Sequence, residues 1–339
     1  MVALLVLFSV GAQAGEDAAR DWIVRMNKAL TSLNYEGVLI HKTVHPVGPR
    51  REVLRIVHRV QAGRMNERIV VEVPMGPGAA EFVRNGNEWM AFYPEQHFVL
   101  VQTRNRSSGF LTALNGFSGD TRRYYEVSDG GSAPLDGWVA RTISLQPRDA
   151  LRYGYRLWLD EKTALPLKTQ MVTNAGEVID EISFLSLALP DSISDEQLKP
   201  EFDASGFNWM KRDDALYTPG LKTVFKPHQE LLPPGFRVRL FTSPAEEARA
   251  PGPRTRFIVS DGIAWVSVVV EQDGRNPKLN GVMGPKDTAR MARNARSDGV
   301  WVMGSTSTYA AKVDGFTITV VGEVPPATVK AIAEAVKPE

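Results

Sequence analysis

Apolar and polar residues alternate with a period of two along most of the chain from Tyr35 to Leu189, a pattern typical of strands. The clearest example is the hairpin formed by 153–160 and 165–172, whose arms are joined by a polar, turn-prone segment. Successive side chains of a strand face opposite sides of the sheet. In the first arm, Leu157 therefore faces one side and Trp158 the other. With large apolar groups on both faces, we expect the sheet to be covered on both sides.

Further strands with the same period precede and follow this hairpin. Asn85-Gly86 separates two of them and is the strongest short-range signal for a tight hairpin turn. Before the first strand, apolar residues recur at three- and four-residue steps from Asp17 to Ser32, which predicts a helix. The predicted strands outside the first hairpin are 37–44, 51–60, 65–73, 81–84, 87–92, 98–103, 124–127, 138–147 and 177–187.

One insertion departs from the strand pattern. Residues 104–121 are rich in Gly, Ser and Asn, yet they contain four large apolar residues that fit one face of a short helix. A curved sheet crossed by such an apolar segment can form a pocket for an acyl chain, because ligand sites are concave and lined by apolar side chains. The candidates for this groove are Phe82, Trp89, Phe92, Phe98, Phe110, Leu111, Leu114 and Phe117. The alternative for each aromatic residue is an ordinary place in the core.

A polar, acidic stretch from Pro190 to Tyr217 interrupts the strands and is interpreted as a domain boundary. Beyond it, 235–241, 254–260, 263–272, 299–307, 309–313 and 315–321 are predicted strands, and 285–295 and 325–336 are predicted helices. The predicted fold class is α+β, with a large N-terminal domain built on a curved antiparallel sheet or half-barrel and a smaller C-terminal α+β domain. The predicted divisions are 1–14, 15–205, a linker at 206–219, and 220–339.

The first residues resemble a secretory signal peptide. Val2 to Val10 is almost wholly apolar, and small residues follow at Ala12 and Ala14, where cleavage would take place. No Lys or Arg follows Met1, so the usual positive segment is either missing or trimmed from this sequence. The apolar run is shorter than the roughly 20 residues that a membrane-spanning helix needs. We expect a mature protein that acts outside the cytoplasm.

Composition excludes several classes of function. The formal net charge is +1 and no long basic run is present, which argues against nucleic acid as a partner. The absence of cysteine rules out disulfides, thiol catalysis and cysteine zinc sites. No nucleophile elbow, P-loop or metalloprotease motif occurs, and His41 and His45 lie on a predicted strand without a third ligand nearby. We therefore expect no enzyme, no cofactor and no metal site.

Arginines are frequent in the second domain. They lie on or near its predicted strands and on its first predicted helix, where Arg290, Arg293 and Arg296 are spaced three apart. Such a set is either a solvated face or a docking surface for an acidic peptide, to which arginine lends specificity and fast association. The candidates for partner binding are Arg237, Arg239, Arg254, Arg256, Arg290 and Arg293.

Two segments in different domains carry a resemblance to a known family. The hairpin Tyr155-Arg156-Leu157-Trp158-Leu159-Asp160 with Leu165-Pro166-Leu167-Lys168, and the late run from Val313 to Pro325, resemble the RseB/MucB family. Its members are periplasmic negative regulators of the extracytoplasmic sigma factor (sigma-E or AlgU). The resemblance covers essentially the whole mature chain, and the family has no short catalytic motif to transfer.

The resemblance implies a specific function. The large domain would be an unclosed barrel like those of the lipoprotein carriers LolA and LolB, able to accept acyl chains. The small domain would help to bind the periplasmic part of a membrane-spanning anti-sigma factor of the RseA/MucA kind and shield it from a DegS-type protease. Mislocalised lipoprotein or lipopolysaccharide would release the complex.

Two other classes of function remain open from the sequence alone. The chain could be a periplasmic lipid or lipoprotein carrier, although a carrier does not obviously need the second domain. A hydrolase with an unrecognised site is the remaining class, and no residue pattern supports it. Whether the protein forms a homodimer is also left open.

Overall fold

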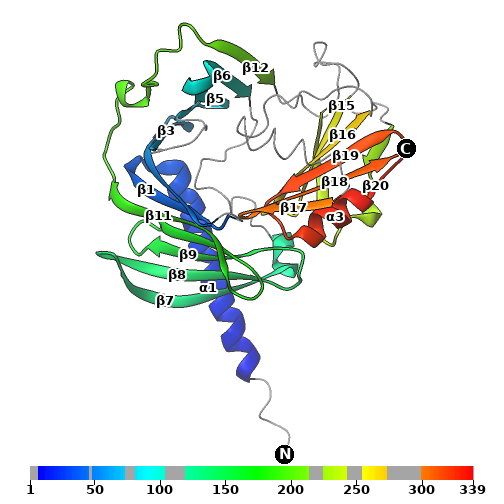
Figure 1. Cartoon of the computed structure of the whole chain (residues 1–339). Coiled ribbons are helices and arrows are strands. Elements are labelled where there is room, and N and C mark those ends of the chain that lie inside the picture. The colour runs from blue at the N-terminus through cyan, green and yellow to red at the C-terminus, as the bar shows by residue number, and fades with distance from the viewer. Residues whose placement is uncertain are drawn as a thin grey trace, which may run out of the picture.

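The structure is a computed structural model, and it describes residues 7–45, 48–72, 81–103, 119–213, 224–242, 254–272 and 299–338. Figure 1 shows two separate sheets, one per domain, which diverge from a junction near β17 and the end of β1. The N-terminal sheet is large and strongly curved, and the C-terminal sheet is smaller and flanked by a short helix.

The N-terminal sheet has 12 strands within the described residues, in the order β12-β6-β5-β4-β3-β2-β1-β11-β10-β9-β8-β7. Neighbours from β6 to β7 pair antiparallel, mostly through hairpins between strands adjacent in sequence. The strands are β1 (Tyr35–Thr43), β2 (Arg50–Gln61), β3 (Arg64–Glu72), β4 (Glu81–Asn85), β5 (Glu88–Tyr93), β6 (Phe98–Thr103), β7 (Tyr125–Leu135), β8 (Trp138–Pro147), β9 (Gly154–Asp160), β10 (Pro166–Val172), β11 (Val178–Ala188) and β12 (Asn208–Asp213).

Helix α1 (Leu7–Ser32) packs against one face of this sheet, called here the inner face. Its buried stripe includes Ile23, Met26 and Leu30, which pack with inner-face residues such as Leu39. Burial of this apolar stripe is the main force that holds the helix in place. No described helix is both long and apolar enough to cross a membrane.

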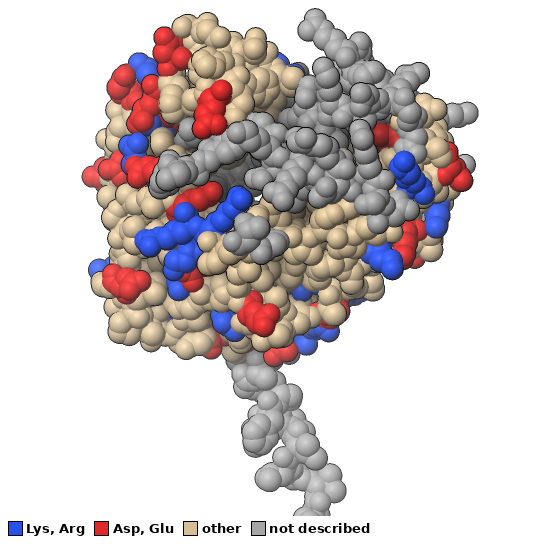
Figure 2. Space-filling model, in the orientation of Figure 1, with Lys and Arg blue, Asp and Glu red and all other residues tan. Residues whose placement is uncertain are grey.

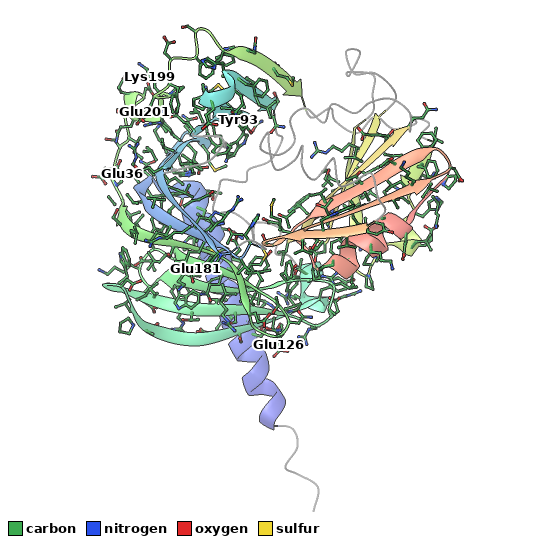
Figure 3. All side chains as sticks on the ribbon, viewed as in Figure 1. Glu36, Tyr93, Glu126, Glu181, Lys199 and Glu201 are labelled. Atoms are coloured by element: carbon green, nitrogen blue, oxygen red, sulfur yellow. The ribbon has the colours of Figure 1, made fainter. Side chains whose placement is uncertain are left out.

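The opposite, outer face is crossed by residues 190–207, called here the strap. Arg59 donates a hydrogen bond to the carbonyl of Ile193 at 3.0 Å, and the amide of Glu201 donates to the buried carboxylate of Glu81 at 3.0 Å. Phe202 and Phe207 of the strap pack on an outer-face cluster of Val83, Phe92, Val99 and Val101. Figure 3 shows Glu36, Lys199 and Glu201 along this side of the sheet. The strap thus shields apolar residues that would otherwise face water.

The strap ends in β12, which adds to the edge of the sheet beside β6. The strap crosses the outer face and then runs in the same direction as β6, so β12 and β6 pair parallel. All other strand pairs in the described sheets are antiparallel. Parallel partners need a long crossover between them, and here residues 104–207 connect the two strands.

The C-terminal domain is built on a six-stranded antiparallel sheet in the order β14-β15-β16-β19-β18-β17. Helix α3 (Pro326–Glu334) covers one face, where Val329 and Ile332 pack on a second core with Val268 and Val320. The strands are β14 (Arg237–Thr242), β15 (Arg254–Ser260), β16 (Trp265–Gln272), β17 (Gly299–Met303), β18 (Thr306–Val313) and β19 (Phe316–Gly322), with β13 (Phe225–Pro227) and β20 (Val336–Pro338) in a small separate sheet. Short 3-10 turns are η1 (Pro94–Gln96), η2 (Gly119–Arg123), η3 (Glu196–Leu198) and η4 (Gln229–Leu231).

The predicted fold class is confirmed: a large curved sheet and a smaller sheet domain, with few helices. The first helix begins earlier than predicted, at Leu7, and the strand predicted at 124–127 continues to Leu135 through a bulge. Trp158 lies on the outer face and is half-buried beneath Lys168, so the expected full cover on both faces is not found at this position among the described residues. The predicted helices at 110–117 and 285–295 lie outside the described residues.

Candidate binding surfaces

A buried arginine connects the two domains at one end of their junction. Arg152 follows β8 and is completely buried, and its Nε donates to Oδ2 of Asp261 at 2.6 Å. Its guanidinium also pairs with Asp149 and lies between the rings of Tyr124 and Phe236, at 4.4 and 4.9 Å from their centroids. A buried arginine must be paired in this way, since an uncompensated charge in the interior is very costly.

The turn between β15 and β16 supplies the C-terminal side of this contact. Asp261 Oδ1 accepts hydrogen bonds from the amides of Ile263 and Ala264, which fixes the turn that presents Oδ2 to Arg152. Ile263 itself packs into the N-terminal core. The side chain of Thr328 also donates to the carbonyl of Leu151 at 2.8 Å. This end of the junction, called here the sealed end, is therefore fixed by both packing and hydrogen bonds.

The other end of the junction is polar and open to solvent. His41 on β1 donates to Asp180 at 2.8 Å and faces Glu52 at 3.6 Å. Burial alone would lower the pKa of His41, but its hydrogen bonds to Asp180 and Glu52 outweigh this and raise the pKa to about 10. Glu323 from the C-terminal domain keeps part of its surface in solvent, but protein surrounds its carboxyl group. The pKa of Glu323 is raised because this carboxyl group loses hydration and because Asp180 nearby is negatively charged. This open end holds one histidine cation among three carboxyl groups.

A row of polar residues crosses the inner face of the N-terminal sheet. Tyr35, His58, Glu67, Arg84 and Trp89 are direct cross-strand neighbours on β1 to β5. His58 stacks on Tyr35 with ring centroids 4.4 Å apart, and its Nδ1 donates to Glu67 at 2.8 Å. The guanidinium of Arg84 lies 5.2 Å from the ring of Trp89. The first four residues are buried, so the row adds a charged layer to an otherwise apolar core.

The groove candidates do not all share one face. Phe82 and Trp89 lie on the inner face, where Phe82 packs against the core and Trp89 continues the polar row. Phe98 is also on the inner side, with its ring 5.9 Å from that of Tyr93. Phe92 faces the outer side and is buried under the strap, apart from the other three. The remaining candidates, Phe110, Leu111, Leu114 and Phe117, lie outside the described residues.

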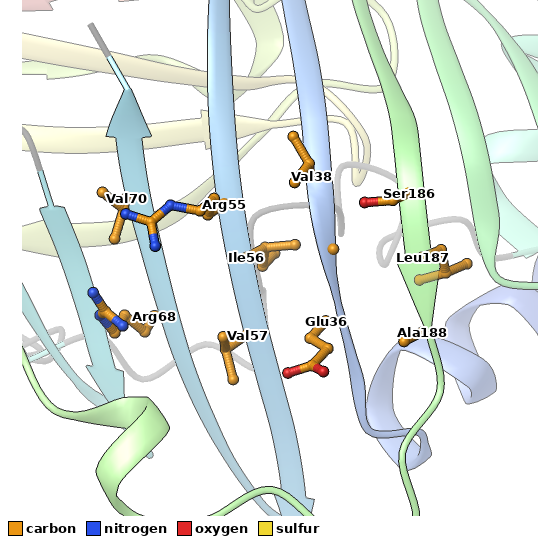
Figure 4. Close-up of a pocket in the computed structure, with 11 residues that line it drawn as sticks. Glu36, Val38, Arg55, Ile56, Val57, Arg68, Val70, Ser186, Leu187 and Ala188 are labelled. Atoms are coloured by element: carbon orange, nitrogen blue, oxygen red, sulfur yellow. The ribbon is translucent and has the colours of Figure 1, made fainter.

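A shallow groove of about 350 Å³ lies on the outer face beside the strap. Figure 4 shows its valine floor, to which Val38 and Val57 contribute, and the two arginines Arg55 and Arg68 along one side. Both arginines already pair with Glu201 of the strap. Because its cations are already paired, this groove offers little charge for a further ligand.

Three arginine candidates of the second domain, Arg237, Arg239 and Arg256, have described side chains, and these three do not form one cluster. Arg237 and Arg239 are exposed on the edge strand β14. Arg256 pairs with Thr242 at the other end of that strand, about 16 Å from Arg237 at the usual rise per residue. Its Nε donates to Ser267 at 3.1 Å. The side chain of Arg254 is not among those described, and Arg290 and Arg293 lie outside the described residues.

Charge is mixed over the visible surface. Figure 2 shows Lys and Arg interspersed with Asp and Glu on both domains, in keeping with a formal net charge of +1. Over the parts of the chain that are described, no three His, Asp or Glu side chains gather closely enough to hold a metal ion.

The sequence pattern did not reveal the residues of the junction. The sequence pattern places Asp261 simply between the predicted strands 254–260 and 263–272, whereas in the structure Asp261 is the buried partner of a distant arginine. Arg152 next to Tyr153 gave no signal of burial. The candidate binding residues predicted from the sequence also do not include the exposed pair Trp209 and Met210 on β12. The signal that could have found them is an aromatic residue in an otherwise polar linker.

Both domains of the chain match known protein families. Residues 18–202 match the family model described as MucB/RseB N-terminal domain, and residues 224–337 match the MucB/RseB C-terminal domain. The sigma factor AlgU regulatory protein MucB of Pseudomonas aeruginosa is 26% identical, over 98% of this chain and 95% of its own length. The sigma-E factor regulatory protein RseB of Escherichia coli K12 is 27% identical, over 98% and 94%.

Solved structures agree with this relationship at the level of fold. MucB in complex with MucA(peri) superposes with a TM-score of 0.65 at 23% identity, covering 95% of this chain and 99% of that one. A MucA/MucB complex from Pseudomonas aeruginosa gives a TM-score of 0.66 at 21% identity, with the same coverage. With both family models matched in the expected order, the chain belongs to the MucB/RseB family of sigma factor regulatory proteins.

Proposed function

We propose that this protein is a periplasmic regulator that binds the periplasmic part of a membrane-spanning anti-sigma factor. In this role it shields the anti-sigma factor from regulated proteolysis and so represses the envelope stress response. The observation that carries the proposal is the match of both domains, in order, to a family whose named members are sigma factor regulatory proteins. Family members solved as complexes with MucA add support.

The periplasmic location rests on the N-terminal segment. Its apolar run and the small residues Ala12 and Ala14 suit export and cleavage. A mature chain from Gly15 would still contain all of α1 that packs in the described core, from Ala19 onwards. Fusion of the first residues to a reporter enzyme that is active only after export tests this directly; a fusion that is produced but shows no reporter activity contradicts it.

Partner binding is tested with the mature chain and the periplasmic segment of the anti-sigma factor from the same organism. We expect saturable heat in calorimetry with Kd below about 1 µM, equivalent to roughly 8 kcal/mol. A DegS-type protease should then cleave the bound anti-sigma segment more slowly than the free one. Absence of binding at micromolar concentrations would contradict the proposed function.

Within this function, Arg237 and Arg239 are the described arginines that best suit an acidic partner, because both are exposed on an edge strand. Replacing both with Ser should weaken binding and reduce its dependence on salt, since exposed charges act mainly on association and are screened by ions. Arg148, exposed in the N-terminal domain and paired with Glu126, serves as the matched control.

Release by a lipid signal is the second part of the proposal. An acyl chain of a lipoprotein or lipopolysaccharide would enter the apolar inner side of the large sheet near Phe82 and Phe98, which are inner-face aromatics. Replacing Phe110 or Leu114 with Asp should abolish acyl binding and leave the fold intact. The control Leu185→Asp, at an exposed site, should leave both acyl binding and the fold unchanged. If acyl binding survives the first two changes, the groove is elsewhere.

A further inference from the structure

The four edges of the two large sheets differ in how they face solvent. The edge strand β7 carries mainly polar or small residues such as Glu126, Ser128 and Pro134, and a bulge interrupts its pairing with β8. On β14, Arg237 and Arg239 are exposed. Charges, prolines and bulges are the usual means by which edge strands avoid pairing with other chains. Two of the four edges are therefore protected.

The edge strands β17 and β12 expose apolar side chains, but in different ways. Val300 and Val302 on β17 are 40% and 42% exposed and point to the same face of their sheet. On β12, the consecutive residues Trp209 and Met210 are 55% and 37% exposed and point to opposite faces. Among the edge-strand side chains whose exposure is described, those of β12 are the ones that expose large apolar groups on both faces of the sheet.

Contacts with β6, the strap and Phe92 hold β12 in place, and its other edge has no strand partner among the described residues. The Asn208 amide donates to the carbonyl of His97 at 2.7 Å, and Trp209 Nε1 donates to Ala204 of the strap at 3.3 Å. The ring of Trp209 meets that of buried Phe92 edge-on, with centroids 6.2 Å apart. One strand, β6, neighbours β12 in the described sheet.

We infer that the outer edge of β12 is a strand-addition site for an extended segment of the partner. Main-chain hydrogen bonds to the edge supply affinity in this mode of recognition, and side chains on alternate faces supply specificity. An added strand would place one apolar side chain beside Trp209 on the outer face and another beside Met210 on the inner face. This inference rests on the proposed function, because it takes the periplasmic part of the anti-sigma factor as the occupant.

The charge next to this apolar pair defines the occupant further. Lys211 is exposed directly after Met210 and lies on the same face as Trp209. Antiparallel pairing is the more stable arrangement, and in it the partner's chain meets Lys211 first, then Met210, then Trp209. The matching segment is an acidic residue followed by two large apolar residues, in an extended conformation.

The decisive experiment is calorimetry of Trp209→Ser and Met210→Ser variants against the complete periplasmic segment of the anti-sigma factor. We expect each variant to bind at least about tenfold more weakly, or roughly 1.4 kcal/mol. Leu185→Ser is the matched control, because Leu185 is equally exposed at 55% on β11 of the same sheet and should leave binding unchanged. Thermal unfolding of every variant shows that the fold is retained.

Hydrogen exchange on the native protein provides a measurement that needs no substitution. Amides of residues 208–213 should become protected when the anti-sigma segment binds, as expected for a newly paired edge. A charge exchange, Lys211→Glu with the opposing acidic residue of the partner changed to Lys, should restore affinity that either change alone reduces.

The possible outcomes separate this inference from the function on which it rests. Full binding by both variants without protection of 208–213 overturns the strand-addition site and leaves the proposed function standing. No binding by the native protein overturns the proposed function itself. Protection of 208–213 that rises with protein concentration, without any partner, assigns the edge to a second copy of this chain and also overturns the inference.

Discussion

The two ends of the domain junction use charge in opposite ways. At the sealed end, one arginine and one aspartate are excluded from water and pair at 2.6 Å between two aromatic rings. At the open end, His41 lies among Asp180, Glu52 and Glu323, and these groups keep contact with solvent. The first arrangement fixes how the domains meet, because neither charge can be left alone. The second can vary with protonation at a smaller cost in free energy.

The largest effect is expected for Arg152→Ala. This change leaves Asp261 buried without its cation and should lower the free energy of unfolding by about 3–5 kcal/mol. Denaturant unfolding measures the loss. The double variant Arg152→Ala with Asp261→Asn should recover part of it, because asparagine retains the hydrogen bonds to the turn amides and carries no charge. A single-variant loss below about 1 kcal/mol would mean that the sealed end is hydrated.

The second-largest loss of stability is expected for Gly235→Ala. Gly235 has a φ of +86° and its hydrogen faces the ring of Tyr124, so a methyl group meets both backbone strain and a steric clash. Gly315 has a similar φ of +75° but open space around it. Gly315→Ala should cost about 1 kcal/mol in thermal unfolding, and Gly235→Ala clearly more. Equal losses would show that Tyr124 moves aside freely.

A smaller, pH-dependent effect is expected for His41→Gln. A histidine whose folded pKa is raised to about 10 stabilises the protein fully below its unfolded value near 6.5 and loses that effect as the pH rises through 10. The free energy of unfolding of the native protein should therefore be higher than that of the variant by about 1–3 kcal/mol near pH 6, and the two should be equal above pH 10. Unfolding titrations across this range measure the difference; a constant gap would contradict the assignment.

Glu181→Gln provides the opposite pH dependence. Burial would raise the pKa of Glu181, but hydrogen bonds from Lys42, Gln170 and Lys168 outweigh it and lower the pKa to about 2. Its stabilising effect is present above the unfolded value near 4.3 and is lost as the pH falls through about 2. In free energy of unfolding, His41→Gln should thus differ most from the native protein at low pH, and Glu181→Gln should differ most at high pH.

The smallest effect is expected for Arg148→Ala. Arg148 and Glu126 form an exposed pair at 3.4 Å, close in sequence to Arg152 but facing solvent. Such pairs contribute about 0–1 kcal/mol, and the change should lie at the limit of detection in denaturant unfolding. A loss comparable with that of Arg152→Ala would remove the distinction between buried and exposed charge on which the comparison depends.

The sequence predicted the hairpins well because their signals are local. Period-two alternation and the Asn85-Gly86 turn placed β4 and β5 within about one residue of their observed bounds. The arm predicted at 165–172 is β10, which begins at Pro166, a position where a strand tolerates the missing amide hydrogen. The family resemblance carried the functional hypothesis, because no local pattern specifies a regulatory protein.

The parts that could not be predicted are non-local. Burial of Arg152 depends on a turn more than 100 positions later, with Asp261 as its partner. The strand β12 depends on parallel pairing with β6 across a long crossover, which no turn signal marks. Phe92 and Phe82 looked equivalent as aromatic residues, yet their register places them on opposite faces of one sheet.

The position of Ile263 indicates that the two domains defined along the sequence do not fold as two independent units. This residue belongs to the turn between β15 and β16 of the C-terminal domain, yet it is part of the N-terminal core. A fragment ending at residue 205 would leave a vacancy at that site and would deprive Arg152 of its partner Asp261. Calorimetry of the intact chain should therefore give one melting transition for both sheets, and the N-terminal half should be most soluble when made together with the rest.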